Sequence, residues 1–301
     1  MIRVTQLQLH DASLASVMRS RAQLQRVQTE AMTGERVTKP SDDPTASARA
    51  RLVGDLQARA DTYRAIAGHG TARLQTAEQA LAEVGNVLVR ARELATAMAN
   101  ETVSSEQRAS AAIETEQLRR ALVDLVNTRD GDEYVFAHVD THAPPYQDGL
   151  GFTYDVDTHA DVREAEVAQG RTAEIGASGS RAFAQRAADP GSLDVVAAVA
   201  GLTDALAAND PDAVRASIDT LTAAFDQALG ERTAVGERMQ MLQRADEQAQ
   251  QSATVLAGVR ADLLDADITE ALSRLQLAET TVRAALSVAA RMLGPSLLDA
   301  R

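Results

Sequence analysis

The sequence predicts a mainly α-helical protein whose long antiparallel helices form a coiled-coil-like bundle, with a small β-rich insert between them. Two long stretches carry apolar residues at alternating spacings of three and four, the period of helices that pack along a seam. Aromatic residues make up only 3% of the 301 residues, so narrow seams of Ala, Leu and Val fit the composition better than one thick core. Strand and turn signals are concentrated in the middle of the chain.

The longest predicted helix begins at Pro44 and continues to about Met98. Its seam contains no charged residue, and Gly68 and Gly70 are its expected weak point because glycine lowers helix stability. Three charged residues lie beside the seam. The residues expected to pack here, between helices or between subunits, are Leu74, Leu81, Leu88, Arg90, Arg92, Glu93 and Leu94.

Two further helices have recognisable starts. Ser104 with Gln107 fits a capping box, which satisfies two free amides at a helix N-terminus. Asp210 followed by Pro211 predicts a second start, since proline suits the first helical position. Near the other end of the chain, a second seam runs to Met292 and is stopped by Gly294 and Pro295. Its expected packing residues are Leu264, Ile268, Leu275 and Val282.

The middle of the chain reads differently. Short segments such as EYVFAHV and FTYDV are broken by APPY and DGLG, which are strand and turn signals. Residues 130–190 hold 12 Asp and Glu against 4 Arg, a net charge of −8. We therefore predict an N-terminal helical part over 1–130, an acidic β-rich outer domain over 131–190 and a C-terminal helical part over 191–301.

Charge and composition exclude several kinds of partner. A formal charge of −13 disfavours nucleic acid and anionic lipid, whose affinity for proteins depends on Lys and Arg. No apolar run reaches the roughly 18 residues of a membrane span, and no ordinary secretion signal is visible at the N-terminus. Nothing matches a phosphate loop, a nucleophile elbow or a zinc-binding helix. We expect the chain to bind no cofactor and to catalyse no reaction. An enzymatic or carbohydrate-binding site in the β-rich insert is a remote alternative.

The stretch TGERVTKPSDDPTA, from Thr33 to Ala46, raises a separate question, because two adjacent carboxylates could mark a site. Proline disfavours helical backbone at the residue before it, and an N-cap needs that non-helical backbone and a side chain that accepts an amide hydrogen bond. Asp43 before Pro44 meets both needs. The motif Pro40, Ser41, Asp42, Asp43 and Pro44 is therefore interpreted as a helix corner, with Ser41 and Asp42 available to further amides of the new helix.

Two other groups of polar residues invite a metal site. His138 and His142 are four apart with His159 nearby, but the segment reads as strand and loop, where that spacing does not align side chains. Asp265, Asp267 and Glu270 lie close together in the sequence and could form a carboxylate cluster. Acidic residues on the exposed face of a long helix are commoner than carboxylates that bind a metal. No metal site is predicted at either place.

Four segments resemble the bacterial flagellin family. The corner sequence TGERVTKPSDDPTASARA resembles the turn after the family's first helix, and its PSDDP form favours the junction proteins of the family. RARELATAMANETVSSEQR is similar to the family's Arg-Glu-Leu helix and the turn that follows. NTRDGDEYVFAHVDTHAPPY resembles the exit into an outer β domain. LDADITEALSRLQLAETTVRAALSVAARMLGPSLLD is similar to the C-terminal helix.

The resemblance implies a structural protein of the bacterial flagellum, with its N- and C-termini packed together. It implies a ring of identical subunits between hook and filament, with hook-associated protein 1 on one side, flagellin on the other and an export chaperone at the C-terminal helix. It further implies export through the flagellar secretion channel to an extracellular place in the flagellum, without a cleaved signal. Arg90, Arg92 and Glu93 would then contact neighbouring subunits, although a solvated charged face explains them equally well. Flagellin itself is the alternative.

The sequence departs from the family's pattern at two places. Ala137 and His138 stand where the family more usually has a small residue and glycine, which leaves open the turn into the outer domain. The chain ends SLLDAR, whereas junction proteins tend to end with an aromatic and a leucine after the Asp. Contacts that depend on those last side chains are therefore not carried over.

Overall fold

The computed structural model describes residues 2–137, 140–157 and 162–293. Their contacts divide the chain into two compact units, a terminal unit of Met1–Arg59 with Ser252–Arg301 and a central unit of Ala60–Gln251. The helices α2 (Pro44–Met98) and α6 (Pro211–Leu264) contribute to both units. These units group the chain differently from the division predicted at residues 130 and 190, which stays a prediction.

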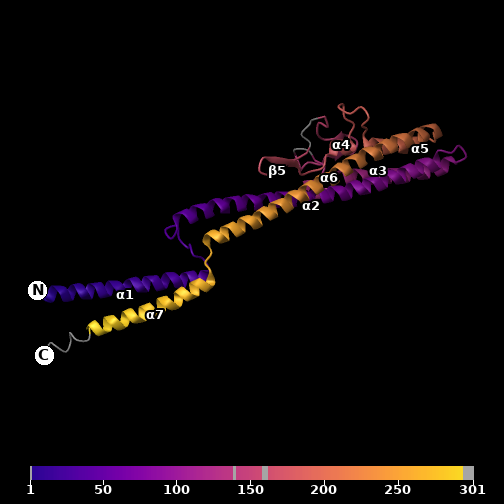
Figure 1. The fold of residues 1–301 in the computed structure, drawn as a ribbon. Coiled ribbons are helices and arrows are strands. Elements are labelled where there is room, and N and C mark those ends of the chain that lie inside the picture. Colours follow the sequence, from indigo (N-terminus) through magenta and orange to yellow (C-terminus); the bar gives the residue numbers. More distant parts are fainter. Residues whose placement is uncertain (1, 138–139, 158–161, 294–301) are drawn as a thin grey trace. The chain divides into compact units, whose positions relative to one another are not determined.

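The terminal unit contains a pair of helices from the two ends of the chain. Helices α1 (Ile2–Thr33) and α7 (Ile268–Leu293) lie side by side (Figure 1). Small and β-branched side chains line their contact, and the Glu30 carboxylate accepts a hydrogen bond from the Arg274 guanidinium at 2.9 Å. The buried apolar residues of the pair are Val17, Val27, Ala271, Ala278 and Val282. The predicted packing of the two termini is confirmed.

The central unit is a helical bundle built on α2 and α6. The two helices run antiparallel, since Arg232 of α6 forms a 2.6 Å ion pair with Glu78 of α2, while Gly70 lies against Leu242. Helix α3 (Ser105–Val126) packs against α5 (Val195–Ala207). Helix α3 starts at the predicted capping box, because the Ser104 hydroxyl accepts from Gln107 N–H and the Gln107 side chain accepts from Ser104 N–H. The predicted mainly α fold with antiparallel helices is confirmed.

Gly70 is a packing position rather than a weak point. Helix α2 runs through Gly68 and Gly70 without a break. A Cβ atom at Gly70 would lie 2.8 Å from the Leu242 Cδ1 atom and 3.1 Å from Ile175. Glycine therefore lets α6 and the insert approach the helix closely. At Gly68 a Cβ atom would meet nothing within 4 Å, so packing does not require glycine there, and a weak point at Gly68 stays a prediction.

The insert consists of three antiparallel strand pairs and a short helix, α4 (Gly179–Phe183). The pairs are β1 (Arg129–Asp130) with β2 (Glu133–Tyr134), β3 (Tyr146–Gln147) with β4 (Gly151–Phe152), and β5 (Glu164–Ala168) with β6 (Arg171–Glu174). The Phe136 and Phe183 rings meet edge to face 5.0 Å apart and join the core formed with the helices. The predicted small β-rich insert is confirmed, with very short strands.

Along the described chain, no helix combines the length and the apolar character needed to cross a lipid bilayer.

Candidate functional site

The predicted corner joins α1 to α2. Helix α1 ends at Thr33, and Gly34 turns the chain with φ +74° while its N–H donates to the Glu30 carbonyl at 2.9 Å. A positive φ at a helix C-terminus favours glycine. Helix α2 begins at Pro44, where the Asp43 carboxylate accepts the Ala46 N–H at 2.9 Å. This hydrogen bond lowers the pKa of Asp43, so the carboxylate is charged where the amides of the new helix are free.

Asp42 has a different task from the one expected of it. Its carboxylate accepts the Lys39 N–H at 2.9 Å and the Thr38 hydroxyl at 3.2 Å, and the hydrogen bond from Lys39 lowers the pKa of Asp42. Both partners precede the helix, so Asp42 closes the turn rather than capping α2. Ser41 is exposed. The two adjacent carboxylates thus stabilise two successive parts of one corner.

The corner also forms backbone hydrogen bonds with the end of α6. The N–H groups of Arg36 and Val37 donate to the Leu264 carbonyl at 2.7 and 3.2 Å, and the Ala266 N–H donates to the Gly34 carbonyl at 2.8 Å. Residues Glu35 and Asp265 form an antiparallel bridge between these bonds. Two breaks far apart in the sequence are therefore joined in the terminal unit.

The second predicted seam is interrupted at this joint. Helix α6 ends at Leu264 and α7 begins at Ile268, so these two residues do not share one helix. The Asp267 carboxylate accepts the Thr269 and Glu270 N–H groups at 2.8 and 3.2 Å, which makes it the cap of α7. The placement of Asp267 on an exposed face within a long helix was wrong, because a cap needs non-helical backbone.

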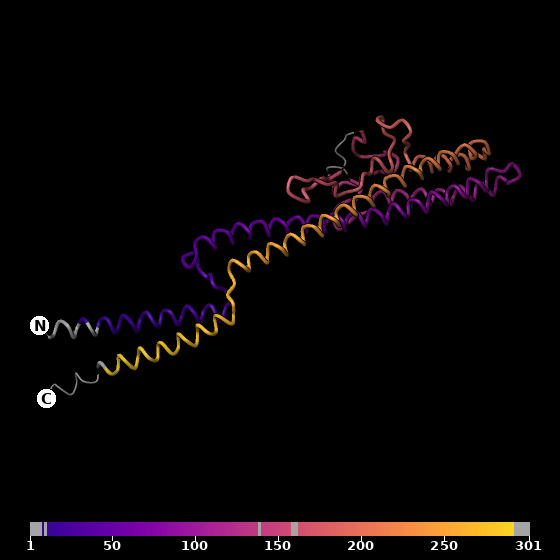
Figure 2. Tube along the Cα trace, viewed as in Figure 1, coloured from indigo at the N-terminus to yellow at the C-terminus, as the bar shows by residue number. Residues whose placement is uncertain are grey.

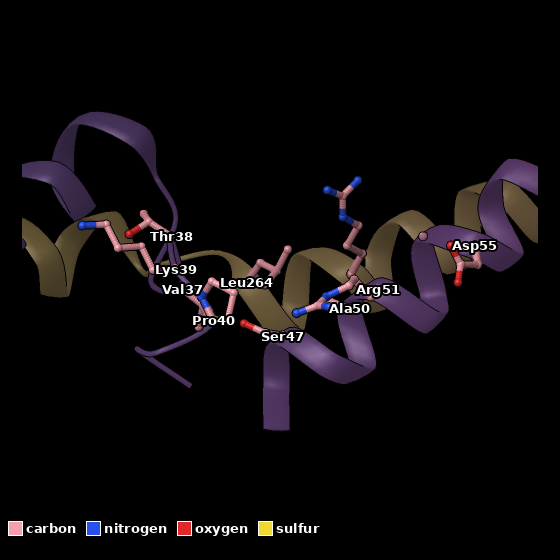
Figure 3. A pocket seen from close by; sticks show the side chains of 11 residues that line it. Val37, Thr38, Lys39, Pro40, Ser47, Ala50, Arg51, Asp55 and Leu264 are labelled. Atoms are coloured by element: carbon pink, nitrogen blue, oxygen red, sulfur yellow. The ribbon is translucent and has the colours of Figure 1, made fainter. Parts of the chain in front are cut away.

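Beside the joint lies an open hollow of about 350 Å³, shown in Figure 3. Pro40, Val37 and Leu264 line it together with the first turns of α2 and Arg260 of α6. No group of three or more potential metal-ligating side chains occurs among the residues that the structure describes. Of the histidines considered for a metal site, His138 and His159 lie outside the described residues.

Replacing Asp43 by alanine is expected to lower the free energy of unfolding of the terminal unit by about 0.5 to 2 kcal/mol, because the Ala46 N–H loses its acceptor. Asn at this position should cost much less, since its side-chain oxygen still caps the helix. Urea denaturation followed by circular dichroism measures both. Equal losses in the two variants would contradict the capping role.

The predicted packing residues of α2 face the interior of the central unit. Leu74, Leu81, Leu88 and Leu94 are buried. The charged residues beside them have partners in the same chain. Arg90 forms ion pairs with Glu114 at 2.8 Å and with Glu93 at 3.3 Å, and these carboxylates raise the pKa of Arg90. The Arg92 guanidinium lies 6.0 Å from the centre of the Phe225 ring. Arg90 and Glu93 remain exposed and so are available to a partner, whereas Arg92 is half-buried.

The packing residues predicted in the last part of the chain are less well covered. Val282 is buried, Leu264 and Leu275 are half-buried, and Ile268 is exposed. Exposed large apolar side chains are concentrated in the terminal unit as a whole. Of the 15 found among the described residues, 12 lie in this unit, and the other three are Ile113, Leu150 and Leu229. Contiguous exposed apolar surface marks a site of association.

Two buried charged residues were missed by the sequence argument. The Glu231 carboxylate of α6 accepts from Arg181 of α4 at 3.1 Å, from Arg238 at 2.8 Å and from the Ser178 N–H at 2.9 Å. Arg108 of α3 donates to the Met98 and Asn100 carbonyls and to the Asn209 side chain. The only sign of the buried Glu231 in the sequence was its spacing of seven residues from Arg238, which places the two side chains on one helix face.

The insert is also fastened to α3 by charge. Arg119 donates to both carboxylate oxygens of Asp148, which follows β3, and to Glu116 of its own helix. The hydrogen bond from Arg119 lowers the pKa of Asp148, and that of Glu116 to about 2. A carboxylate whose pKa is lowered by folding stabilises the fold above its unfolded pKa, and this contribution is lost as pH falls through the folded pKa.

We therefore expect the stability of the central unit to fall as pH is lowered from about 6 to about 3, with Asp148 contributing to the loss. Asp148→Asn should weaken the unit at about pH 6 and reduce its pH dependence. Urea midpoints at the two pH values measure both effects. An unchanged pH dependence in this variant would show that the Arg119 pair does not stabilise the insert.

Comparison with known proteins agrees with this architecture. Residues 4–141 match the family model of the bacterial flagellin N-terminal helical region. The chain is 26% identical over 317 residues to flagellar hook-associated protein 3 of Escherichia coli, covering 99% of both chains.

Solved structures show the same fold. FlgL of Xanthomonas campestris aligns with a TM-score of 0.60 at 16% identity, over 68% of this chain and 98% of that one. The flagellar junction protein FlgL of Legionella pneumophila aligns with a TM-score of 0.55 at 15% identity, over 73% and 100%. Residues 4–141 are therefore a bacterial flagellin N-terminal helical region, and the resemblance of the whole chain to flagellar hook-associated protein 3, a structural protein of the flagellum, is confirmed.

Proposed function

We propose that this chain joins the hook of the bacterial flagellum to its filament, as a ring of identical subunits on which flagellin assembles. The observation that carries the proposal is the concentration of 12 exposed large apolar side chains in the terminal unit. An isolated chain gains little by exposing them, whereas an assembly that covers them gains their burial. The similarity over 99% of a flagellar hook-associated protein 3 supports the same role.

Several partners would contact this chain in the flagellum. Further copies of the chain form the ring, hook-associated protein 1 lies on the hook side and flagellin on the filament side. An export chaperone binds the C-terminal helix before secretion, which takes place through the flagellar secretion channel without a cleaved signal. Leu264 at the end of α6 packs within this assembly, as do Ile268, Leu275 and Val282 of α7. Arg90, Arg92 and Glu93 supply polar contacts between subunits, since two of them remain exposed although paired.

A deletion strain tests the proposal. Cells lacking the chain should build hooks, lose motility and release flagellin into the medium, because the first filament subunits have no ring on which to assemble. Immunoblots of culture medium and of purified hooks measure this, and expression of the wild-type chain in the same strain is the control. A deletion strain that swims with firmly attached filaments would contradict the proposal and favour a minor filament subunit instead.

A further inference from the structure

An exposed aliphatic ridge runs across α2 and α6 within the terminal unit. Its members are Leu52 and Leu56 of α2 with Val255 and Val259 of α6, each between 39% and 62% exposed. The two residues of each pair are four apart, so each pair shares a helix face. The ridge is separate from the contact between α1 and α7, and nothing in the fold of the described chain covers it.

The register of the two helices places the pairs at the same level. Arg64 of α2 forms an ion pair with Asp246 of α6, and Gly70 lies against Leu242, so residues of the two helices whose numbers add to about 311 lie opposite each other. Ser47, Arg51, Arg260 and Leu264, which line one hollow, agree with this register. Leu52 then lies level with Val259, and Leu56 with Val255. At about 100° per residue, both pairs point away from the hollow, toward one side of the helix pair. The four side chains therefore form one surface.

Unpaired cations flank this ridge. Arg49 and Arg59 lie one turn from Leu52 and Leu56 on the same helix, and neither has an ion-pair partner within the part of the chain that the structure describes. Asp262 is the acidic residue nearest Val259 on α6. The chemistry of the ridge suits an apolar surface that carries carboxylates at its edge.

Such a surface exists in the central unit, at the N-terminal end of α3. Ile113 is 66% exposed there, and Ala111, two residues before it on the same helix, lines a hollow of about 400 Å³ together with Leu94 and Met98. Glu106 and Glu114 lie at the same hollow. Glu114 shares Arg90 with Glu93, whereas Glu106 has no ion pair among the described residues. This α3 surface therefore has an apolar floor with two carboxylates at its edge.

A ring of identical subunits needs two different surfaces on each copy, because a head-to-tail contact joins one patch to another. We propose that the ridge of one subunit docks on the α3 surface of a second copy of this chain. The inference rests on the proposed ring and specifies which faces meet in it. Aliphatic side chains of the ridge pack against Ile113 and the apolar hollow, while Arg49 and Arg59 approach Glu106.

The chain contains no cysteine, so introduced cysteines test this contact directly. The chain carrying Leu52→Cys with Ile113→Cys is expressed in the deletion strain, and its intact flagella are treated with a short bismaleimide. We expect the monomer band of this chain to be replaced by a ladder of dimers, trimers and larger species, as a head-to-tail contact requires. The matched control is Leu52→Cys with Leu229→Cys, since Leu229 is exposed on α6 outside both surfaces. It should give no ladder.

Failure of the contact and failure of the proposed function have different signatures. If both double variants retain filaments and neither gives a ladder, the ridge does not dock on the α3 surface, although the junction role stands. If the deletion strain does not release flagellin, the proposed junction role is wrong, whatever the result of the cross-linking. High salt during cross-linking should weaken the ladder, because it screens the charges that flank the ridge. A ladder of equal strength in the control would also overturn the contact.

Discussion

Replacing Glu231 with alanine is expected to lower the free energy of unfolding of the central unit by about 3 to 5 kcal/mol, the usual cost of removing one partner from a buried ion pair. Only 2% of this side chain is exposed. Its loss leaves Glu174, at 2.6 Å, as the ion-pair partner of Arg238 among the described residues, and it removes the carboxylate that accepts the Ser178 N–H. Because Ser178 and Arg181 belong to the insert, we expect the insert to detach from α6 first.

Urea denaturation of the full chain measures the loss, and hydrogen exchange shows where it falls. Glu237→Ala is the matched control, because Glu237 is an exposed carboxylate on the same helix, and surface changes of this kind cost at most about 0.5 kcal/mol. Glu231→Gln keeps the shape of the side chain and removes its charge. If Glu231→Ala unfolds at the same urea concentration as Glu237→Ala, the network contributes nothing to stability.

Leu88→Ala should destabilise the central unit by about 2 to 5 kcal/mol, because Leu88 is almost completely buried and its removal leaves a cavity between helices. The opposite behaviour is expected of Leu277 in α7, which is 67% exposed. Leu277→Ala should change the stability of the isolated chain by no more than about 0.5 kcal/mol. In cells it should weaken assembly, since this side chain is available to a neighbouring subunit.

Two measurements separate these effects. Thermal unfolding of the purified variants reports on the isolated chain, and flagellin released into the medium reports on assembly. A substantially destabilised Leu277→Ala protein would mean that α7 is already covered in the monomer. A fully stable Leu88→Ala protein would contradict the assignment of Leu88 to the core.

Local signals in the sequence predicted the elements that depend on local chemistry. Ser104 with Gln107, and Asp210 before Pro211, mark helix starts whose hydrogen bonds lie within three or four residues. The seam of α2 was likewise visible from its period, and its residues from Leu74 to Leu94 are buried as a packed helix requires. The spacing of apolar residues and the capping signals therefore predicted most of the helical fold.

The remaining features depend on residues that meet across long stretches of sequence. The break after Leu264 has neither Gly nor Pro, and its cap Asp267 looked like one more charge in an acidic helix. Glu231 is buried because Arg181 comes from the insert, fifty residues away. Gly70 is needed because Leu242 lies against it. In each case the deciding partner is set by tertiary packing, which one sequence does not display.

The joint between the corner and the end of α6 has a mechanical consequence. Its three hydrogen bonds connect main-chain atoms of Gly34, Arg36 and Val37 with those of Leu264 and Ala266. A force that separates the two segments of the joint acts on all three hydrogen bonds at once, so they resist it together. Because amides and carbonyls are common to nearly all residues, the joint can keep its strength while most of its side chains change. Gly34, at φ +74°, and the Arg36 guanidinium, which donates to the Leu263 carbonyl at 3.0 Å, tie it to particular residues.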